Sequence, residues 1–308
     1  MPSGQAFLDQ LSRAIWFDNT RGRPFVVNLP LLRQLIAAEQ KALAGTGQKT
    51  RTDTGQMKPV PFGGAGPTPT VPAIVMIGAD GPATGGDGED VFLDQKNTNG
   101  HILIAAGGNA TRAVSVPTRG GDGACLGGSE GLTVGLGGHG AITLNPPTMP
   151  YGANGTDGGR GGHGAAGVKG QGCVIVGEGG NGGRGSPGQV ALPASPGWPP
   201  GGIGGFFLIQ PRPPGTPGTD GDDGDGGVGW AIGEDHADYT AVGGRAWRPP
   251  VPTWNLPGIP PAPLTLWGPV TNPGAYGQHG RALVIHGTVD VTIDCRNGDG
   301  TAGTEMTR

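Results

Sequence analysis

The stretch GANGTDGGRGGHGAAGVKG, residues 152–170, places a glycine at every third position without a miss. Shorter stretches that begin at Gly179, Gly215 and Gly274 keep the same step. A period of three fits neither the α-helix, with about 3.6 residues per turn, nor the strand, whose side chains alternate. It fits the left-handed extended helix with three residues per turn. The glycines of the first stretch are Gly152, Gly155, Gly158, Gly161, Gly164, Gly167 and Gly170.

Glycine along one edge of an extended helix lets another backbone approach without a side chain in between. Two assemblies would satisfy the outward-facing N–H and C=O groups: a collagen triple helix, or one chain whose extended helices pack side by side. Collagen needs long proline-rich Gly-X-Y runs, and residues 152–170 contain no proline. We therefore expect a mostly irregular and β fold, a polyglycine II-type helix sandwich with short β-strands, preceded by a small α-helical N-terminal segment.

The composition excludes several fold classes. Glycine and proline supply 67 and 31 of the 308 residues, and both disfavour helices and sheet ladders. A nucleotide-binding α/β fold, a barrel enzyme or a helical bundle is therefore not expected over most of the length. The net charge of −4 is too small to keep the chain disordered by repulsion, and interspersed charges do not indicate nucleic-acid binding.

Short runs of β-branched and aromatic residues alternate with the glycine tracts and predict strands. These runs lie at 73–78, 101–108, 132–138, 173–180, 205–211 and 282–295. A net backbone hydrogen bond contributes only about 0.5–1.5 kcal/mol. We therefore expect the strands and tryptophans to supply stability that the glycine tracts lack.

The first 60 residues form a compositionally separate unit, because they hold five of the 67 glycines. Helical spacing of apolar residues predicts one helix after Ser3 and a second after Asn28, with Pro30 near its start and Gly45 at its end. We expect three domains. They are a helical anchor segment at 1–48, an extended linker at 49–72, and a glycine-rich body at 73–308 with a Pro/Trp-rich loop at 245–269.

The apolar stripes of the two predicted helices are too extensive for the helices to bury on each other alone. They would dock on a partner protein, on a second copy or on the glycine-rich body, where they would merely cover one end. As candidates for attachment to a partner we take Phe7, Leu8, Leu11, Ile15, Leu32, Leu35, Ile36 and Leu43.

Aromatic side chains in the second half of the chain are the best candidates for binding a receptor. Tryptophan offers a large contact area with few rotatable bonds, which favours recognition surfaces. The alternative is that these rings stack on glycine or proline to complete a core. The candidates are Trp198, Trp230, Tyr239, Trp247, Trp254 and Trp267.

The acidic stretch TDGDDGDGG at 219–227 is a weak candidate for a calcium site. Its oxygen ligands would be Asp220, Asp222, Asp223 and Asp225. Gly224 occupies a position where the calcium loop needs a third ligand, so a solvated acidic face is the preferred interpretation. We expect no bound metal and no cofactor.

Catalytic motifs are not found. The six histidines lack metalloprotease spacing, and neither a nucleophile elbow nor a phosphate-binding loop occurs. Cys125, Cys173 and Cys295 are widely separated and predict free thiols that act as small apolar residues. No secretion signal or membrane-spanning run is visible, and we expect a protein that is not an enzyme.

Residues 61–308 resemble the glycine-rich adhesins and the tail-fibre or head-fibre proteins of tailed bacteriophages. The resemblance is carried by GGRGGHGAAG, GEGGNGGRGSPG and GTPGTDGDDGDGG. It implies a sandwich of glycine helices, loops that contact a receptor on the bacterial surface, and an N-terminal segment that binds other virion proteins. It also implies a location on the phage particle and a homo-oligomer, with a trimer as the natural guess for a fibre.

Two other roles stay open at this point. The chain could be a capsid decoration, cement or collar protein with purely architectural contacts. It could also be an ice-binding or extracellular glycine-rich protein with a flat, regular face.

Overall fold

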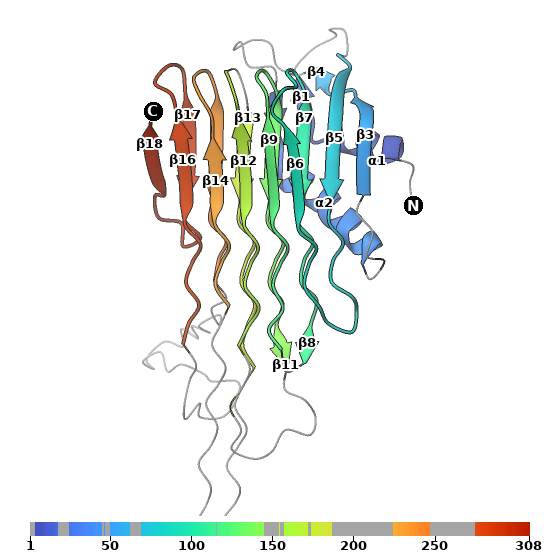
Figure 1. Cartoon of the computed structure of the whole chain (residues 1–308), viewed down its shortest axis with the longest axis vertical. Coiled ribbons are helices and arrows are strands. Elements are labelled where there is room, and N and C mark those ends of the chain that lie inside the picture. Colours follow the sequence, from blue (N-terminus) through green and yellow to red (C-terminus); the bar gives the residue numbers. More distant parts are fainter. Residues whose placement is uncertain are drawn as a thin grey trace, which may run out of the picture.

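The computed structural model describes residues 4–17, 25–44, 46, 50–61, 69–114, 116–144, 154, 157–171, 174–186, 224–246 and 275–308. The body of this described part is a pair of stacked β-sheets whose strands run along the longest axis of the molecule (Figure 1). Two helices pack on the outer face of one sheet, so this part of the chain has three layers.

The helices are α1 (Gly4–Leu11) and α2 (Leu29–Leu43). The start of α2 agrees with the sequence: the Asn28 side chain accepts a hydrogen bond from the Leu31 N–H at 3.1 Å, and Pro30 lies in the first turn. The apolar spacing after Ser3 predicted a helix that includes Ile15, but Ile15 instead begins a strand.

That strand belongs to a small three-stranded sheet. β1 (Ile15–Phe17) pairs antiparallel with β2 (Phe25–Val27) and parallel with β4 (Val60–Pro61). A further two-stranded sheet joins β8 (Ala113–Val114) and β11 (Thr143–Leu144).

The two large sheets are almost entirely parallel. In spatial order, the seven-stranded sheet consists of β17 (Thr292–Arg296), β15 (Asp238–Val242), β13 (Val174–Glu178), β10 (Leu132–Leu136), β7 (Ile102–Ala106), β5 (Val71–Ile77) and β3 (Thr50–Met57). The six-stranded sheet consists of β18 (Thr304–Thr307), β16 (Ala282–His286), β14 (Gly229–Ile232), β12 (Gly164–Val168), β9 (Gly123–Gly127) and β6 (Val91–Gln95). Only β3 runs antiparallel to its neighbour.

From β5 onward, successive strands of the large sheets alternate between the two sheets. Short connections such as 128–131 and 287–291 lie at one end, which we call the turn end. Longer connections that contain the glycine tracts lie at the other, which we call the glycine end (Figure 1). Strands that are adjacent in one sheet are therefore separated in sequence by a pass through the other sheet.

Two buried layers hold the stack together. Between the helices and the seven-stranded sheet, Leu8 and Leu32 belong to one cluster with side chains of β5, β7, β10 and β13. Between the two sheets, small side chains such as Ala166 and Ala231 pack with larger ones such as Ile175. The alternation of small and large residues lets the two sheets approach closely without a thick core.

Beyond the strands, backbone hydrogen bonds join neighbouring glycine tracts within each layer and across the layers. Within a layer, the Gly161 N–H donates to the Asp225 carbonyl at 2.9 Å. Across the layers, one run of hydrogen bonds crosses the whole stack, and each member donates its N–H to the carbonyl of the one before. Its members are Gly108, Gly121, Gly138, Gly162, Gly180, Gly227, Gly244, Gly280 and Gly298.

The expected fold class is wrong. The described residues form an α/β-type fold, with two helices on stacked parallel and mixed sheets, and not a mostly irregular sandwich of glycine helices. Inside the tract at 152–170, Gly164–Val168 is the strand β12, whose burial alternates with a period of two. The periodicity of glycine alone misled the prediction, because alanine and valine at intervening positions pack well between sheets.

The expected linker at 49–72 is also wrong for its first part. β3 occupies residues 50–57 of that segment and pairs antiparallel with β5 at the edge of the seven-stranded sheet. Gly55 lies where an added Cβ would meet the tip of the Leu8 side chain, so α1 packs directly on this strand.

The apolar runs located several strands correctly. Runs at 73–78, 101–108, 132–138 and 173–180 correspond to β5, β7, β10 and β13, and the run at 282–295 contains β16 and β17. The run at 205–211 lies outside the described residues. The prediction missed β6, β9, β14, β15 and β18, in which glycine, alanine or polar residues replace the β-branched side chains.

Candidate functional site

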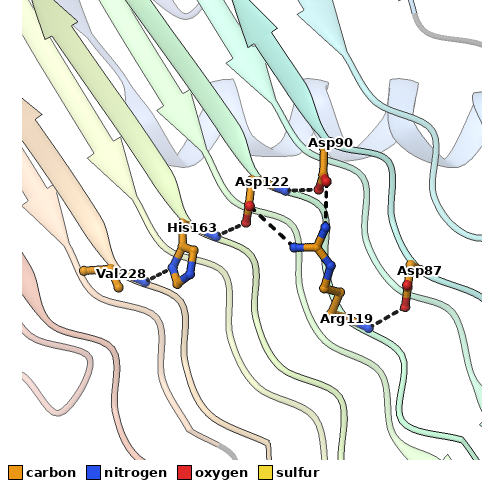
Figure 2. A network of polar contacts seen from close by, with 6 residues as sticks. All are labelled: Asp87, Asp90, Arg119, Asp122, His163 and Val228. Atoms are coloured by element: carbon orange, nitrogen blue, oxygen red, sulfur yellow. Dashed lines mark hydrogen bonds and ion pairs between the residues drawn. The ribbon is translucent and has the colours of Figure 1, made fainter.

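A row of polar side chains crosses the glycine tracts that continue the six-stranded sheet. The Asp122 N–H donates to Asp90 Oδ1 at 2.8 Å, and the His163 N–H donates to Asp122 Oδ1 at 2.7 Å. The Val228 N–H then donates to His163 Nδ1 at 3.0 Å (Figure 2). We call Asp90, Asp122, His163 and Val228 the six-strand ladder. The side chains of Asp90, Asp122 and His163 each accept the main-chain N–H of the equivalent residue on the next tract.

Arg119 lies beside this ladder and joins two of its carboxylates. Its guanidinium donates to Asp90 Oδ2 at 2.6 Å and to Asp122 Oδ2 at 3.5 Å, while its N–H donates to Asp87 Oδ1 at 2.8 Å (Figure 2). Partial burial opposes the charged form, but the Asp90 and Asp122 carboxylates raise the pKa of Arg119. Because all these groups are about half exposed, water screens the ion pairs and their stabilising effect is small.

The other layer carries a second ladder of the same design. The Asn109 N–H donates to Asp80 Oδ1 at 2.8 Å, and the His139 N–H donates to Asn109 Oδ1 at 2.9 Å. The Asn181 N–H then donates to His139 Nδ1 at 2.9 Å, and the Arg245 N–H donates to Asn181 Oδ1 at 2.8 Å. We call these five residues the seven-strand ladder. Only Asp, Asn and His occupy the accepting positions of both ladders, since their acceptors are close enough to the main chain to reach the next tract.

The seven-strand ladder also fixes the position of α2. The Gln40 side chain donates to the Gly107 carbonyl at 2.6 Å, and the Asn109 side chain donates to Gln40 Oε1 at 3.2 Å. About two turns earlier on α2, Arg33 forms a two-point ion pair with the buried carboxylate of Glu178, with Nε and Oε2 at 2.6 Å.

His139 accepts a hydrogen bond through Nδ1 and is therefore neutral in the seven-strand ladder. Although the residue has an exposed edge, desolvation of the ring lowers its pKa below the ordinary 6.5, and the Arg33 charge lowers it further. Asp80 and Glu178 act in the opposite direction.

We expect the stability of the protein to fall as the pH drops below about 6.5, because the unfolded chain then binds a proton that folded His139 resists. The contribution is fully present above that pH and is lost as the pH falls through the lower pKa of the folded state. Urea unfolding at pH 8 and pH 5.5 should show a difference of up to about 1.5 kcal/mol, the value of one hydrogen bond. His139→Asn keeps an acceptor and should reduce this difference; an unchanged difference would assign the pH dependence to other groups.

Neither ladder has the geometry of a catalytic or metal site. Each accepting side chain is already hydrogen-bonded to a main-chain N–H, and no group of metal-ligating side chains occurs among the described residues. Cys125 is buried between the sheets, where burial raises the pKa of its thiol to about 12, and Cys295 is likewise buried and free. Cys173 lies outside the described residues. The ladders are therefore structural devices.

The receptor-binding candidates fall into different environments. Trp230 lies on the outer face of β14 with 40% of its surface exposed, and its ring is parallel to that of His163 at 6.4 Å. Tyr239 is only 1% exposed, and its hydroxyl donates to the Glu234 carbonyl, so it belongs to the core and is not a binding residue. The other candidates lie outside the described residues: Trp198, Trp247, Trp254 and Trp267.

The expected attachment residues pack inside the molecule. Seven of them are buried in the cluster beneath the helices: Phe7, Leu8, Leu11, Ile15, Leu32, Ile36 and Leu43. Leu35 is partly buried and packs against the same cluster. Their assignment as a virion anchor is therefore wrong, because the outer face of the seven-stranded sheet already covers these apolar stripes.

The predicted packing glycines lie in two kinds of surroundings. In the glycine tracts and at the start of β12, an added Cβ would collide with a neighbouring backbone carbonyl at three positions: Gly158, Gly161 and Gly164. In contrast, a Cβ on Gly167 would meet the Leu126 side chain at 3.2 Å and the Ile232 carbonyl oxygen at 3.7 Å, with no collision. Gly170, with φ of +132°, adjoins Ser129 in a turn. Gly152 and Gly155 lie outside the described residues.

Asp225 is the described member of the proposed calcium ligands. Its Oδ1 accepts the Gln278 N–H at 2.7 Å, and its Oδ2 lies 3.7 Å from Arg160 Nε. The remaining three, Asp220, Asp222 and Asp223, lie outside the described residues.

The glycine end is the best candidate for a functional site. The described chain leaves this end after Leu144, Ser186 and Ala246 (Figure 1). The two longer connections from it, residues 187–223 and 247–274, contain Trp198, Trp247, Trp254 and Trp267, which are four of the six tryptophans. At the turn end, by contrast, the connections from β6 onward are short.

No protein-family model, curated protein or solved structure matches this chain. No described helix combines the length and apolar character required to cross a membrane.

Proposed function

We propose that this chain is a structural virion protein of a tailed bacteriophage, a fibre or adhesin that presents the connections of its glycine end to the host surface and performs no catalysis. The observation that carries the proposal is the placement of four tryptophans in connections that all start and finish at one end of a stiff body. Aromatic residues of this kind dominate recognition surfaces.

The stiffness of the body supports this role. Backbone hydrogen bonds cross the stack at successive levels, and at the level nearest the glycine end the Gly224 N–H donates to the Gly183 carbonyl at 2.8 Å. The described residues at the bases of residues 187–223 are therefore held in place. A receptor-binding segment on a fixed base loses less conformational freedom on binding than one on a mobile base.

Competition with phage adsorption tests the proposal. The purified full chain should block adsorption of the phage that encodes it to its bacterial host. A variant in which a short Gly/Ser linker replaces residues 187–223 should fold, because the adjacent tracts are bonded to each other, and should lose at least about tenfold in blocking activity, or about 1.4 kcal/mol of binding. The matched control is Glu130→Ala at the turn end, which should block normally.

An architectural role is the second candidate, favoured by an exposed apolar face on the six-stranded sheet, described below. If the full chain does not block adsorption, the attachment role is wrong. If particles that lack the chain then lose capsid or tail integrity on heating, a cement or collar function takes its place.

A further inference from the structure

The six-stranded sheet has an apolar outer face that the described part of the chain leaves uncovered. Two rows of side chains cross this face: the first consists of Phe92, Ala124, Ala165, Trp230, Leu283 and Thr304, and the second of Asp94, Leu126, Gly167, Ile232, Ile285 and Met306. Phe92, Trp230 and Met306 are 64%, 40% and 53% exposed. An apolar patch of this extent on a soluble domain marks an interaction surface.

The seven-stranded sheet shows how this chain treats an outer face that meets water. Its apolar part, over β5, β7 and β10, lies under the helices. Its uncovered part on β17 is polar, with Thr292, Asp294 and Arg296 pointing outward. On the seven-stranded sheet, the apolar part is thus covered and the uncovered part on β17 is polar. The six-stranded sheet differs, because its uncovered outer face is apolar.

We propose that this face binds the same face of a second copy, in a parallel dimer whose two-fold axis runs along the strands between β12 and β14. That axis places β12 against β14, β9 against β16 and β6 against β18 of the second copy. Both copies then direct their glycine ends the same way. The inference concerns assembly and does not depend on the attachment role.

Side-chain sizes on the face are complementary under this axis. Ala165 faces Trp230 of the second copy, and Gly167 faces its Ile232, because these pairs share a register level on adjacent strands. One strand further out, Ala124 faces Leu283 at the same level as Trp230. Next to the axis, small residues of β9 and β12 thus meet larger ones of β14 and β16, which lets the two faces interdigitate there. Further out, Leu126 meets Ile285 as a pair of large side chains, and Phe92 meets Thr304.

Charges at the adjoining polar rows are complementary as well. Next to the apolar rows, Asp122 on the β9 side faces Arg281 on the β16 side, since each precedes its strand at the same level. One level nearer the glycine end, Arg160 faces Asp225 of the second copy. The tracts that carry these two residues are hydrogen-bonded neighbours within each copy. Opposite charges meet at both levels, which favours this orientation over one with the strands reversed.

The face is large enough for a stable interface. Six strands at about 4.8 Å spacing span about 29 Å across the sheet. The two apolar rows and the two adjoining polar rows together span about 25 Å along the strands, so each copy buries roughly 700 Å². The total of roughly 1,400 Å² lies in the range of specific protein interfaces, about 1,200–2,000 Å².

The mass of the full chain in solution tests the proposal. Light scattering after gel filtration at tens of micromolar should give twice the chain mass of 30.7 kDa. A mass of one copy, or the three copies guessed for a fibre, would overturn the two-fold arrangement.

Two substitutions locate the interface. Ile232→Lys places an ammonium group against the second copy and should give a monomer, whereas Val289→Lys, at a residue 45% exposed in the turn 287–291, should remain a dimer. Arg281→Glu brings like charges together at Asp122 and should raise the dimer dissociation constant at least about tenfold. Arg281 is exposed, so this variant decides the matter if Ile232→Lys does not fold. A dimer that survives Arg281→Glu unchanged would place the contact elsewhere and overturn the proposal.

Discussion

Gly180→Ala should lower the free energy of unfolding by more than about 3 kcal/mol, the upper range for an overpacked site. An added Cβ would lie 2.5 Å from the Gly138 carbonyl carbon and still closer to its oxygen, both of them main-chain atoms. Relief would require the tracts of Gly138 and Gly180 to separate. This would break the hydrogen bonds from the Gly137 N–H to the Glu178 carbonyl and from the Gly140 N–H to the Asn181 carbonyl, each 2.8 Å long. Urea denaturation followed by circular dichroism measures the change.

The matched control is the same substitution at Gly167. Its Cβ would meet the end of the flexible Leu126 side chain at 3.2 Å and the Ile232 carbonyl oxygen at an ordinary contact distance of 3.7 Å, so we expect a loss below about 1 kcal/mol. Equal losses at Gly180 and Gly167 would mean that intrinsic backbone preferences, and not the close approach of tracts, determine the need for glycine. Gly167 lies in the proposed dimer face, and dimerisation would add to the apparent stability. Both variants should therefore be compared at a protein concentration at which light scattering shows a monomer.

Leu32→Ala should destabilise the isolated chain by about 2–5 kcal/mol, the usual range for truncating a buried leucine. Leu32 is 0% exposed and lies between α2 and the seven-stranded sheet. If the helices served instead to attach the protein to another virion component, the stability of the isolated chain would be almost unaffected. Thermal or urea unfolding of the full chain measures this difference.

Leu35→Ala on the same helix is the control for helix propensity. Leu35 is only partly buried against the cluster, so its truncation should have less than half the effect of Leu32→Ala. A larger loss at Leu35 than at Leu32 would contradict the packing of α2 on the sheet.

Local signals predicted the elements whose sequences are locally unambiguous. Asn28 and Pro30 marked the start of α2, and dense β-branched runs marked β5, β7 and β10, because each signal acts within a few residues. β9, with the sequence GACLG, lacks such a signal. It is a strand because neighbours in the same sheet, distant in sequence, supply its hydrogen bonds.

The two polar ladders were less predictable than these elements. His163 and Asn181 were recognisable as outward-facing residues of a three-residue repeat, but their hydrogen bonds to Val228 and Arg245 join tracts about 65 residues apart. Recurrence of Asp, Asn and His at the outward position was the available signal. This signal could not show which tracts are neighbours in space, since that depends on the alternation of strands between the two sheets.

The cross-layer hydrogen bonds restrict how the body can change in length during evolution. A single inserted residue would shift one tract out of step with every tract that it contacts, whereas additions of three residues made in all the tracts together would preserve each contact. Insertions in residues 187–223 or 247–274 would leave the described tracts in step with one another. Sequence drift in relatives of this protein should therefore concentrate at one tip, while the shaft keeps a fixed length.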